Sequence, residues 1–543
     1  MPTFNKSKNK AEVLVIGAGA SGSIASRYLA ESGFKVICLE QGDFVHQNEY
    51  YTNSPGWEVM QQSRWHPNPN IRGLASDYPI NTDFTDVNPL MYNAVGGSTI
   101  IYAAHWHRFT PSDFSTKSLD GVGEDWPIKY KDLAPFYDHL DIDMGVSGLV
   151  GDPAFPPGSP PPLPPLPIGK IGRKAAEGMN KLGWHWWPGS QAIPSRFYRG
   201  RSKCTRRGMC MSGCPEEAKA TMDKTHMLDA LKFGAQIITG ARVRKITCDA
   251  KGLASGAIYI DRKGIEHHQS AEIVLVCCNG IGTPRLLLNS TSSKFPDGLA
   301  NNSGMVGRNL MMHPFAAVVG YFDDNLDSWQ GPNGLNIYSM EFYETDQNRG
   351  FVRGARWSAQ GTGGPLGLRS SMDGQPVDDV WGKAFHQNIR KRLGKSIEWG
   401  IVAEDLPEYE NKVDLDPNLK DSDGIPAPRI KYRNSENTKK LISFHVARAK
   451  EALLASGAYE LSSTELMTDS GWHLLGTCRM GNDPQKSVVD SWCRSHDVPN
   501  LFIIDGSTFV TSSGVNPTAT IGAISLRTSL FIIENRSQIE CSM

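Results

Sequence analysis

Apolar and polar positions follow a clear order in the first forty residues of the chain. The apolar run 13–16 predicts a buried strand, and a glycine-rich turn follows it directly. A helical pattern over about residues 21–32 ends near Gly33, and a second apolar run, 35–39, ends at Glu40. This order of strand, glycine turn, helix and strand is typical of a nucleotide-binding unit.

The same kinds of pattern return later, separated by less regular sequence. Residues 271–290 again indicate strand, glycine turn and helix, and residues 501–533 indicate strand, loop and helix, whereas residues 315–470 alternate short apolar runs with polar loops. The pattern predicts an α/β protein in which one nucleotide-binding domain is assembled from discontinuous segments and a second domain is inserted. We assign the nucleotide-binding domain to residues 1–120, 222–315 and 485–543, and the inserted domain to residues 121–221 and 316–484.

Composition and charge exclude several classes of protein. The chain of 543 residues has 56 Lys and Arg against 57 Asp and Glu, which leaves no global basic field for nucleic acid or an acidic membrane. No apolar run approaches the roughly 20 residues that a bilayer-spanning helix needs, so no membrane span is predicted. The polar N-terminus lacks the apolar stretch of a signal peptide. We therefore expect cytoplasmic synthesis, with a periplasmic location only if a partner subunit provides export.

The glycine-rich turn has the spacing G-x-G-x-x-G, formed by Gly17, Gly19 and Gly22. The first glycine permits the tight turn, the second lets the backbone approach a pyrophosphate, and the third lets the helix pack closely on the strand. The phosphates then lie at the helix N-terminus, where free N–H groups favour anions. Glu40 is placed to bind a ribose diol, which disfavours the 2′-phosphate of NADP. The motif predicts dinucleotide binding but does not separate FAD from NAD.

Three of the ten cysteines, Cys204, Cys210 and Cys214, lie close together, with a proline directly after the last. Thiolates with such spacing suit iron–sulfur ligation, and a proline after the final cysteine recurs in cluster motifs. Three ligands are too few for a four-cysteine cluster; they suit a three-iron centre, or a four-iron centre with one outside ligand. Zinc would need a fourth ligand, for which His226 is available, so the residues alone leave the metal open.

Several dispersed segments together resemble the glucose–methanol–choline (GMC) oxidoreductases, a family of FAD enzymes that act on alcohols and sugars. They are the N-terminal glycine motif and the segments VGGST (95–99), DWPIKYKDLAPFYDHLDIDMGVSG (125–148), GTPRLLLNS (282–290), VGRNLMMHP (306–314), HLLGTCRMG (473–481) and LFIIDGSTFVTSSGVNPTATI (501–521). The resemblance spans nearly the whole chain. It implies a Rossmann-like FAD-binding domain and a substrate-binding domain with an antiparallel sheet, in the segments assigned above.

The resemblance also implies particular contacts to FAD. The residues concerned are Gly96, Gly97 and Ser98 along the flavin, Val243 at the adenine end, Asp505 and Gly506 near the diphosphate and the ring, and Thr518 at the pyrimidine. Some relatives attach FAD covalently to a His shortly after the paired glycines, whereas residues 99–102 contain none. We therefore predict non-covalent FAD, with His105 and His107 as wall or structural residues.

Oxidation of an alcohol removes a hydroxyl proton and a carbon-bound hydride. The flavin takes the hydride, so the protein must supply a base, and a neutral histidine with an ordinary pKa of about 6.5 suits this role. The family places a His in the C-terminal region and a His or Asn some forty residues later, which here are His473 and Asn516. The resemblance implies that His473 is the general base and that Asn516 hydrogen-bonds the substrate oxygen.

The cysteine segment resembles the catalytic subunit of bacterial FAD-dependent glucose dehydrogenase and its gluconate and fructose relatives. Those enzymes carry a [3Fe–4S] cluster on cysteines at the same spacing, which implies such a cluster on Cys204, Cys210 and Cys214. Free or structural thiols and another metal are the alternatives. A cluster beside the flavin gives electrons an exit to a cytochrome or another acceptor. A candidate docking patch for the acceptor, for which a solvated loop is the alternative, consists of Arg199, Arg201, Lys203, Arg206 and Arg207.

The resemblance thus implies a dehydrogenase with a small-molecule alcohol or sugar substrate, of a type that often has a small helper subunit. The first alternative is an oxidase that uses dioxygen and makes hydrogen peroxide. A lyase and a non-catalytic flavoprotein are two further alternatives of other classes.

Overall fold

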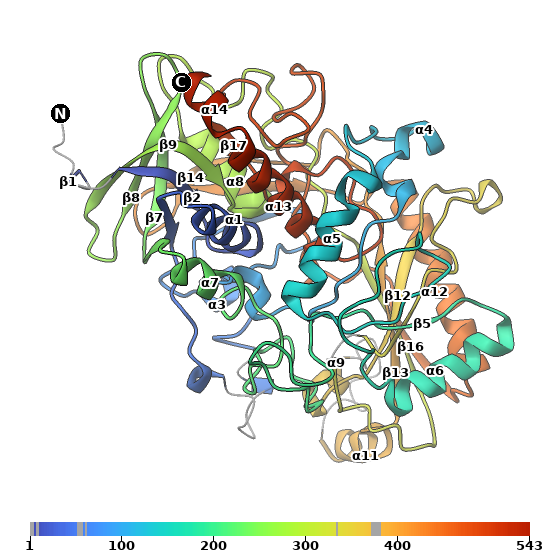
Figure 1. Ribbon diagram of the computed structural model, residues 1–543. Coiled ribbons are helices and arrows are strands. Elements are labelled where there is room, and N and C mark those ends of the chain that lie inside the picture. Colours follow the sequence, from blue (N-terminus) through green and yellow to red (C-terminus); the bar gives the residue numbers. More distant parts are fainter. Residues whose placement is uncertain are drawn as a thin grey trace.

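The structure, a computed structural model, describes residues 5–6, 10–50, 58–59, 62–332, 335–370 and 382–542. Its largest sheet has eight strands in the order β6-β3-β2-β9-β8-β7, with β1 and β17 also paired to β9 (Figure 1). These strands are β1 (Asn5–Lys6), β2 (Ala11–Ile16), β3 (Val36–Glu40), β6 (Gln236–Thr239), β7 (Arg242–Cys248), β8 (Ala254–Ile260), β9 (Glu266–Val276) and β17 (Leu501–Ile503). Pairing is parallel from β6 through β3 and β2 to β9 and β17, and antiparallel among β7, β8 and β9. The parallel half is the Rossmann-like unit.

Helices cover the parallel strands, which are apolar on both faces and therefore buried. β2 and β3 are buried almost throughout. α1 (Ala20–Glu31) follows the glycine turn and packs against α7 (His226–Lys232) and α13 (Thr518–Glu534), and α13 packs in turn against α5 (Tyr130–Met144) (Figure 1). The beginning and the end of the chain thus share one helical layer.

The second sheet has six strands, all paired antiparallel, in the order β16-β10-β13-β12-β11-β5. They are β5 (Trp187–Pro188), β10 (Phe315–Tyr321), β11 (Ile337–Ser339), β12 (Ala355–Gln360), β13 (Ser396–Ala403) and β16 (Glu460–Thr464). α6 (Gly169–Leu182) and α12 (Glu436–Ala455) cover the face where Trp357 and Trp399 are buried. Because successive side chains alternate, Arg356 belongs to the opposite face.

The third sheet packs, through α8, against the first sheet. It consists of β14 (Lys412–Lys420), β15 (Pro426–Tyr432) and β4 (Asn81–Thr85), and α8 (Asn279–Asn289) packs against β14 and β15 as well as β7. The predicted fold class is confirmed: a discontinuous Rossmann-like unit and a second, antiparallel unit. The strands of the first two sheets follow the predicted segments closely, whereas β4 pairs with β15 and α5 packs on α13 across the assigned boundary. The domain bounds remain a prediction.

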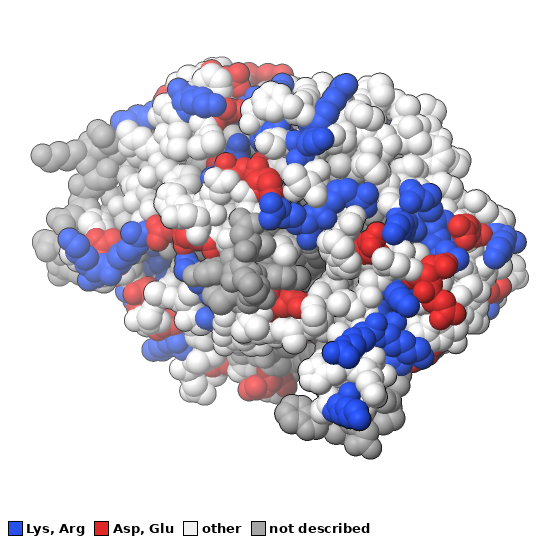
Figure 2. All heavy atoms as spheres, turned by 90° about the horizontal axis from the view of Figure 1, so that it is seen from below, with Lys and Arg blue, Asp and Glu red and all other residues white. Residues whose placement is uncertain are grey.

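The remaining elements are short. They are α3 (Pro69–Arg72), α4 (Thr116–Asp120), α9 (Pro365–Ser370), α11 (Gly382–Arg392), α14 (Arg536–Ser542), η1 (Gln47–Glu49), η3 (Gly97–Ile100), η4 (Pro111–Phe114), η5 (Gln347–Arg349) and η6 (Gly506–Thr508). Among the helices described, none combines the length and the apolar character needed to cross a bilayer. Figure 2 shows Lys and Arg in several groups with Asp and Glu between them, on the face that it draws.

Candidate functional site

A cavity of about 490 Å³ lies where the first sheet ends against the uncovered face of the second sheet. Ile16, Gly17 and Cys277 line it from the carboxyl ends of β2 and β9, the edge at which parallel sheets bind ligands. Arg356 and Gly400 line it from β12 and β13. The cavity therefore has one wall suited to a dinucleotide and a second wall suited to a substrate.

The glycine motif shapes one end of this cavity. Gly17 has a φ of +100°, and a Cβ there would lie 2.5 Å from the carbonyl oxygen of Cys277. A Cβ at Gly22 would overlap the carbonyl oxygen of Gly17. Gly19 differs, because the nearest atom to a Cβ there is the Cα of Gly97 at 4.0 Å. Gly17 and Gly22 are thus required by the packing of the turn, whereas Gly19 leaves space in the cavity wall for a ligand.

A second glycine segment closes this cradle from the opposite side. Gly96 and Gly97 have φ values of +95° and +54°, which favour glycine, and a Cβ at Gly97 would lie 2.8 Å from the Cα of Gly19. Ser98 Oγ accepts a hydrogen bond from Tyr92 N at 3.2 Å. The backbones of these two segments, which are distant in sequence, therefore pack directly against each other at Gly19 and Gly97.

Two buried carboxylates brace the cavity wall. Glu40 accepts hydrogen bonds from the backbone N–H groups of Ala18 and Gly42, both at 2.8 Å. Asp505 accepts one from Ser507 N at 2.8 Å. Burial raises the pKa of both carboxyls, and the backbone N–H groups oppose the rise. Asp505 also accepts hydrogen bonds from Asn279 N at 3.0 Å and Thr283 Oγ1 at 2.6 Å, so it is held mainly by the wall itself.

The structure brings together most of the residues predicted to bind FAD. The cavity is lined by Gly17, Gly19, Glu40, Gly97, Ser98, Val243, Asp505, Gly506 and Thr518. Gly22 and Gly96 are not among the lining residues and lie behind the wall. Thr518 is the first residue of α13, so a helix N-terminus also faces the cavity. The open glycine cradle, the carboxylates and this helix end fit a bound dinucleotide, while the roles of individual residues remain predictions.

His473 and Asn516 lie together on the wall of the same cavity, with Asn516 Nδ2 at 3.2 Å from His473 Nε2. On the other side of the His473 ring, Nδ1 lies 2.6 Å from His313 Nδ1. His313 Nε2 in turn lies 3.1 Å from Ser512 O and 2.7 Å from Ser513 O. Burial lowers the pKa of His473 well below its usual value. His473 is therefore neutral at neutral pH, which is the state that a general base needs.

Two further polar side chains contact Asn516 inside the cavity. Arg356 Nη2 donates to Asn516 Oδ1 at 2.6 Å, and His105 Nδ1 lies 3.1 Å from the same oxygen. His107 does not line the cavity; its ring packs edge-on against Tyr338, with 4.7 Å between ring centroids. His105 is thus a wall residue and His107 lies behind it.

Sequence reasoning missed His313 and Arg356. His313 stands in the segment VGRNLMMHP (306–314), so a signal existed in the family-like sequence but no role was assigned to it. Arg356 gave no signal, because a single arginine in a strand-like run cannot be told from a surface residue before the strand is placed.

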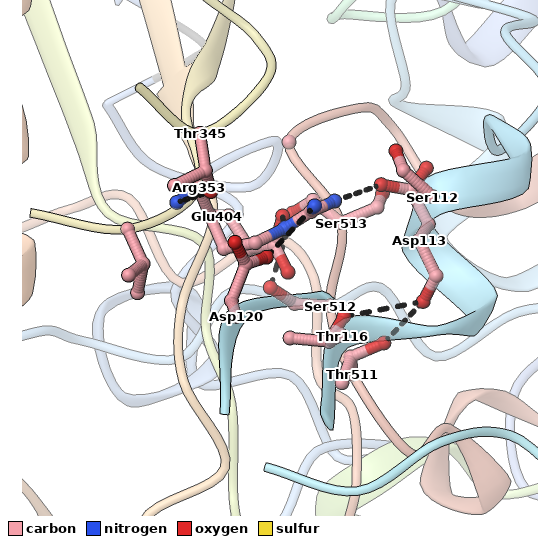
Figure 3. Close-up of polar contacts among 12 residues, drawn as sticks. Ser112, Asp113, Thr116, Asp120, Thr345, Arg353, Glu404, Thr511, Ser512 and Ser513 are labelled. Carbon is pink, nitrogen blue, oxygen red and sulfur yellow. Dashed lines mark hydrogen bonds and ion pairs between the residues drawn. The ribbon is translucent and has the colours of Figure 1, made fainter. Parts of the chain in front are cut away.

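A buried ionic network holds the loop that leads to Asn516 (Figure 3). Arg353 is almost completely buried. Its guanidinium nitrogens lie 2.6 Å from Asp113 Oδ1, 3.3 Å from Asp120 Oδ2 and 2.9 Å from Glu404 Oε2. Burial raises the pKa of Asp113 and Glu404, although the positive charge of Arg353 opposes the rise. Thr511 Oγ1, at the start of the loop, donates to Asp113 O at 2.9 Å. The network therefore holds the start of this loop, although its members do not line the cavity.

The three cysteines of the motif line a second, much smaller hollow. Burial, together with the nearby thiols of Cys210 and Cys214, raises the pKa of Cys204 to about 12. Within the described ranges, no group of three or more His, Cys, Asp and Glu side chains is arranged to hold a metal ion. His226 is not among the residues that line the hollow, and its Nε2 lies 3.4 Å from Asp143. It therefore does not serve as a fourth ligand for zinc in this arrangement.

Lys219 connects the hollow to the cavity wall. Its buried ammonium donates to the carbonyl oxygens of Cys210 at 2.5 Å, Ile100 at 2.8 Å and Tyr102 at 2.9 Å. Burial lowers the pKa of Lys219 to about 8. Met211, which directly follows Cys210, lines the main cavity. The cysteine segment thus lies directly behind one wall of the cavity.

The basic residues beside the cysteines form a smaller patch than the sequence suggests. Arg201 is buried and donates to Met144 O at 2.7 Å, so it cannot contact a partner protein. Arg199 and Arg207 are 50% and 49% exposed, and each pairs with an acidic side chain.

Comparisons with known proteins agree with this site. Family models described as GMC oxidoreductase match residues 11–315 and 407–525. The chain is 42% identical to 2-methyl-1,2-propanediol dehydrogenase of Mycolicibacterium austroafricanum, over 98% of this chain and 97% of that one. It is 32% identical to the fructose dehydrogenase large subunit of Gluconobacter japonicus, over 97% of this chain and 98% of that one. The solved structure of Aspergillus oryzae formate oxidase superposes with a TM-score of 0.64 at 13% identity, covering 99% of this chain and 100% of that one.

These matches span most of the chain and confirm the resemblance that the dispersed motifs indicate. The glycine cradle and the neighbouring imidazole and amide are groups of the kind that such an enzyme requires. The chain belongs to the GMC oxidoreductase family, and it is an FAD-dependent oxidoreductase that acts on the CH–OH groups of alcohols or sugars.

Proposed function

We propose that this enzyme is a dehydrogenase that holds FAD non-covalently, oxidises an alcohol or sugar, and passes electrons through a [3Fe–4S] cluster to an external acceptor. The observation that carries the proposal is the adjacency of the two sites. Cys210 lines the cysteine hollow, and the next residue, Met211, lines the cavity. The two sites are therefore separated by a single stretch of backbone, which supports electron transfer between them.

The residues of the cavity are arranged to remove a hydroxyl proton. Asn516 Nδ2 donates to the substrate hydroxyl oxygen, and His473 Nε2, which lies 3.2 Å from that amide nitrogen, accepts the proton. When bound, FAD supplies the acceptor for the hydride. The buried, neutral imidazole and the amide thus act on the same oxygen atom.

Two observations support non-covalent binding of FAD. Residues 99–102, where some relatives carry the attachment histidine, contain none. The next histidine along the chain, His105, lies 3.1 Å from Asn516 Oδ1 and is thus part of the hydrogen-bonded site.

The cysteine hollow contains the thiols that the proposed cluster requires. All three cysteines of the motif line it, and in a three-iron cluster each cysteine binds a different iron. The buried ammonium of Lys219 offsets part of the negative charge that the thiolates of Cys210 and Cys214 would carry.

The relatives support both the substrate class and the presence of partners. One relative is named as a dehydrogenase of a diol, and another as the large subunit of a fructose dehydrogenase. We therefore include a redox protein such as a cytochrome as the electron acceptor, and a small helper subunit, in the proposal. Arg199 and Arg207, which are half exposed, are available for docking of the acceptor.

Protein purified without oxygen tests this proposal by spectroscopy and metal analysis. We expect about three irons per flavin, and a cluster signal that disappears in Cys204→Ser while the flavin is retained. Cys248→Ser is the matched control, because Cys248 lies in β7 and does not line the hollow. Substrates should reduce a dye acceptor much faster than dioxygen.

The same experiment distinguishes the other functions. An iron-free protein that turns over rapidly with dioxygen and releases hydrogen peroxide would replace the dehydrogenase by an oxidase. A flavin that no alcohol or sugar reduces under anaerobic conditions would point to a lyase or a non-catalytic flavoprotein.

A further inference from the structure

A chain of hydrogen bonds with two fixed ends determines the tautomer of His473, that is, which of its ring nitrogens carries the hydrogen. At one end are the carbonyl oxygens of Ser512 and Ser513, which can only accept. His313 Nε2 lies 2.7 Å from Ser513 O and therefore carries a hydrogen. Burial lowers the pKa of His313 to about 4, so its ring is neutral and its Nδ1 is an acceptor. The 2.6 Å contact between the two Nδ1 atoms then requires the hydrogen to be on His473.

The other end of the chain is Arg356, whose guanidinium can only donate. Its Nη2 lies 2.6 Å from Asn516 Oδ1, which turns the amide NH₂ group of Asn516 toward His473. Asn516 Nδ2 lies 3.2 Å from His473 Nε2, so this ring nitrogen must accept. Both ends thus lead to the same tautomer of His473, with a hydrogen on Nδ1 and a lone pair on Nε2.

Arg356 also carries a charge that no described residue neutralises. Its side chain is completely buried, and its Nε and Nη1 atoms have no hydrogen-bond partner in the described part of the chain. Burial lowers its pKa to about 10, and no carboxylate acts on it, so it stays protonated at neutral pH. By contrast, Arg353, which lies just before β12, forms ion pairs with three carboxylates. A buried charge without a partner is costly, and such charges concentrate at functional sites.

We propose that Arg356 is a positioning residue that acts through Asn516. It fixes the orientation of the amide, and its uncompensated charge stabilises the negative charge that develops on the substrate oxygen. This inference rests on the roles of His473 and Asn516 in the proposed function.

The charges balance along the reaction. As the substrate O–H bond breaks, its proton forms the Nε2–H bond of His473, and a negative charge is left on the oxygen. When bound, FAD would accept the electron pair of the C–H bond as a hydride, and the C=O bond would form with the electrons left on the oxygen. A fixed cation behind Asn516 stabilises the charged stage without reorganising, as preorganised electrostatic groups do.

The pH dependence gives a readout that a purely structural role would not move. Besides burial, His313, Arg356 and His105 are the groups that act on the pKa of His473, and each of them lowers it. Removal of the charge at position 356 therefore raises the pKa of His473. The base then becomes protonated at a higher pH, so the acid limb of the rate profile moves to higher pH.

The test compares Arg356→Gln, Arg356→Lys and the control Arg308→Gln in holoenzyme. Arg308 is a matched arginine outside the cavity, with its guanidinium over the ring of Tyr409 at 4.4 Å. The first measurement is the rate of substrate-driven flavin reduction between pH 5 and pH 9 in a stopped-flow instrument without oxygen. The second is ¹⁵N NMR of protein labelled at histidine, with the His473 signals identified by their loss in His473→Ala.

We expect Arg356→Gln to slow flavin reduction about 100-fold and to shift the acid limb to higher pH. We expect Arg356→Lys, which keeps the charge but not the planar fork, to slow the reaction while the acid limb stays in place. In the wild-type protein, the NMR signals should show His473 neutral with the hydrogen on Nδ1 from pH 6 upward. Arg308→Gln should match the wild-type protein in every measurement.

Arg356→Gln with an unchanged rate and an unchanged acid limb would overturn the proposal, as would a wild-type His473 with its hydrogen on Nε2. If Arg356→Gln does not fold, Arg356→Lys and the wild-type tautomer test the proposal instead. A wild-type rate in Arg356→Lys would contradict the role of the planar guanidinium in orienting Asn516. The NMR measurement needs no substrate. Failure of every alcohol and sugar to reduce the wild-type flavin would therefore count against the proposed function and not against the tautomer.

Discussion

His313 and His473 face each other through their Nδ1 atoms at 2.6 Å, with their rings almost perpendicular at 84°. His313 therefore contacts His473, the proposed base, from the side that faces away from Asn516. Its own Nε2 is held by backbone carbonyl oxygens, so the position of the His473 ring follows the position of the loop behind it.

Substitution of His473, the proposed base, should lower the rate of flavin reduction far more than substitution of His313, which contacts it. We expect His473→Ala to lower this rate between 10²- and 10⁴-fold, the usual range for general-base catalysis. His313→Asn, which keeps an acceptor near the position of Nδ1, should retain more activity than His313→Leu. Anaerobic stopped-flow traces at 450 nm measure all three. Equal losses in the two His313 variants would show that the hydrogen bond to His473 is not what matters.

The contribution of the buried histidines to the stability of the folded protein should fall as the pH drops below about 6.5. His313 and His445 are buried, with pKa values lowered to about 4 and about 3, so the unfolded chain binds protons that the folded chain does not. Their contribution is complete above the unfolded pKa and is lost as the pH falls toward the folded values. At pH 5 each histidine should cost about 2 kcal/mol.

Urea denaturation at pH 7 and pH 5 measures this slope. His445→Gln is an informative variant, because His445 lies outside the cavity and Gln still offers an acceptor to Trp357 Nε1, which donates to His445 Nδ1 at 2.8 Å. The change in stability from pH 7 to pH 5 should be less unfavourable in the variant than in the wild-type protein, by about 2 kcal/mol. An identical loss would exclude His445 as a source of the pH dependence.

Substitutions at two glycines of the motif should have different effects, one on folding and the other on cofactor binding. Gly22→Ala places a Cβ on the carbonyl oxygen of Gly17, so we expect a loss of about 3 kcal/mol or more, or no soluble protein. Gly19→Ala has room in the fold, with the nearest atom at 4.0 Å, and should change stability by less than about 1 kcal/mol. Its methyl group enters the cavity wall, so the purified protein should contain little flavin. Absorbance at 450 nm and thermal unfolding give both quantities, and full flavin content in Gly19→Ala would contradict the assigned cradle.

Arg353 should be important for stability through the carboxylates that it neutralises. Arg353→Met leaves Asp113, Asp120 and Glu404 without their cation, and we expect a loss of about 3–5 kcal/mol. Adding Glu404→Gln removes one of the stranded charges and should restore part of the loss. Thermal unfolding of the single and double variants tests this, and a double variant less stable than Arg353→Met would argue against charge as the cause.

The sequence predicted those parts of the site that depend on local spacing. The positions of Gly17, Gly19 and Gly22 follow from one turn between β2 and α1, and the resemblance to a family supplied His473 and Asn516. Their partners could not be predicted in this way. His313 lies 160 positions from His473, and Arg356 also lies 160 positions from Asn516, so only the packing of different elements brings them together.

The fold was likewise predictable where hydrophobic runs are long and less so elsewhere. The buried strands β2 and β3 and the second half of β9 correspond to apolar runs in the sequence. The pairing of β4 with β15 was not predicted, because β4 is short, largely polar and half exposed. Its place in the third sheet depends on the register of the distant β15, which no local pattern encodes.

The catalytic groups and the wall opposite them belong to different parts of the fold. The segment after His473 hydrogen-bonds to the turn at β17, where Gly476 N donates to Gly506 O, and Asn516 is followed closely by α13, which packs on α1. Ser358 and Gln360 come from β12 of the second sheet and line the same cavity. Ser358 Oγ donates to Gly400 O and the Gln360 amide donates to Glu398, so neither side chain holds His473 or Asn516 as Arg356 does. These two side chains can therefore change without moving His473, so that substrate range can diverge among relatives while the chemistry stays the same.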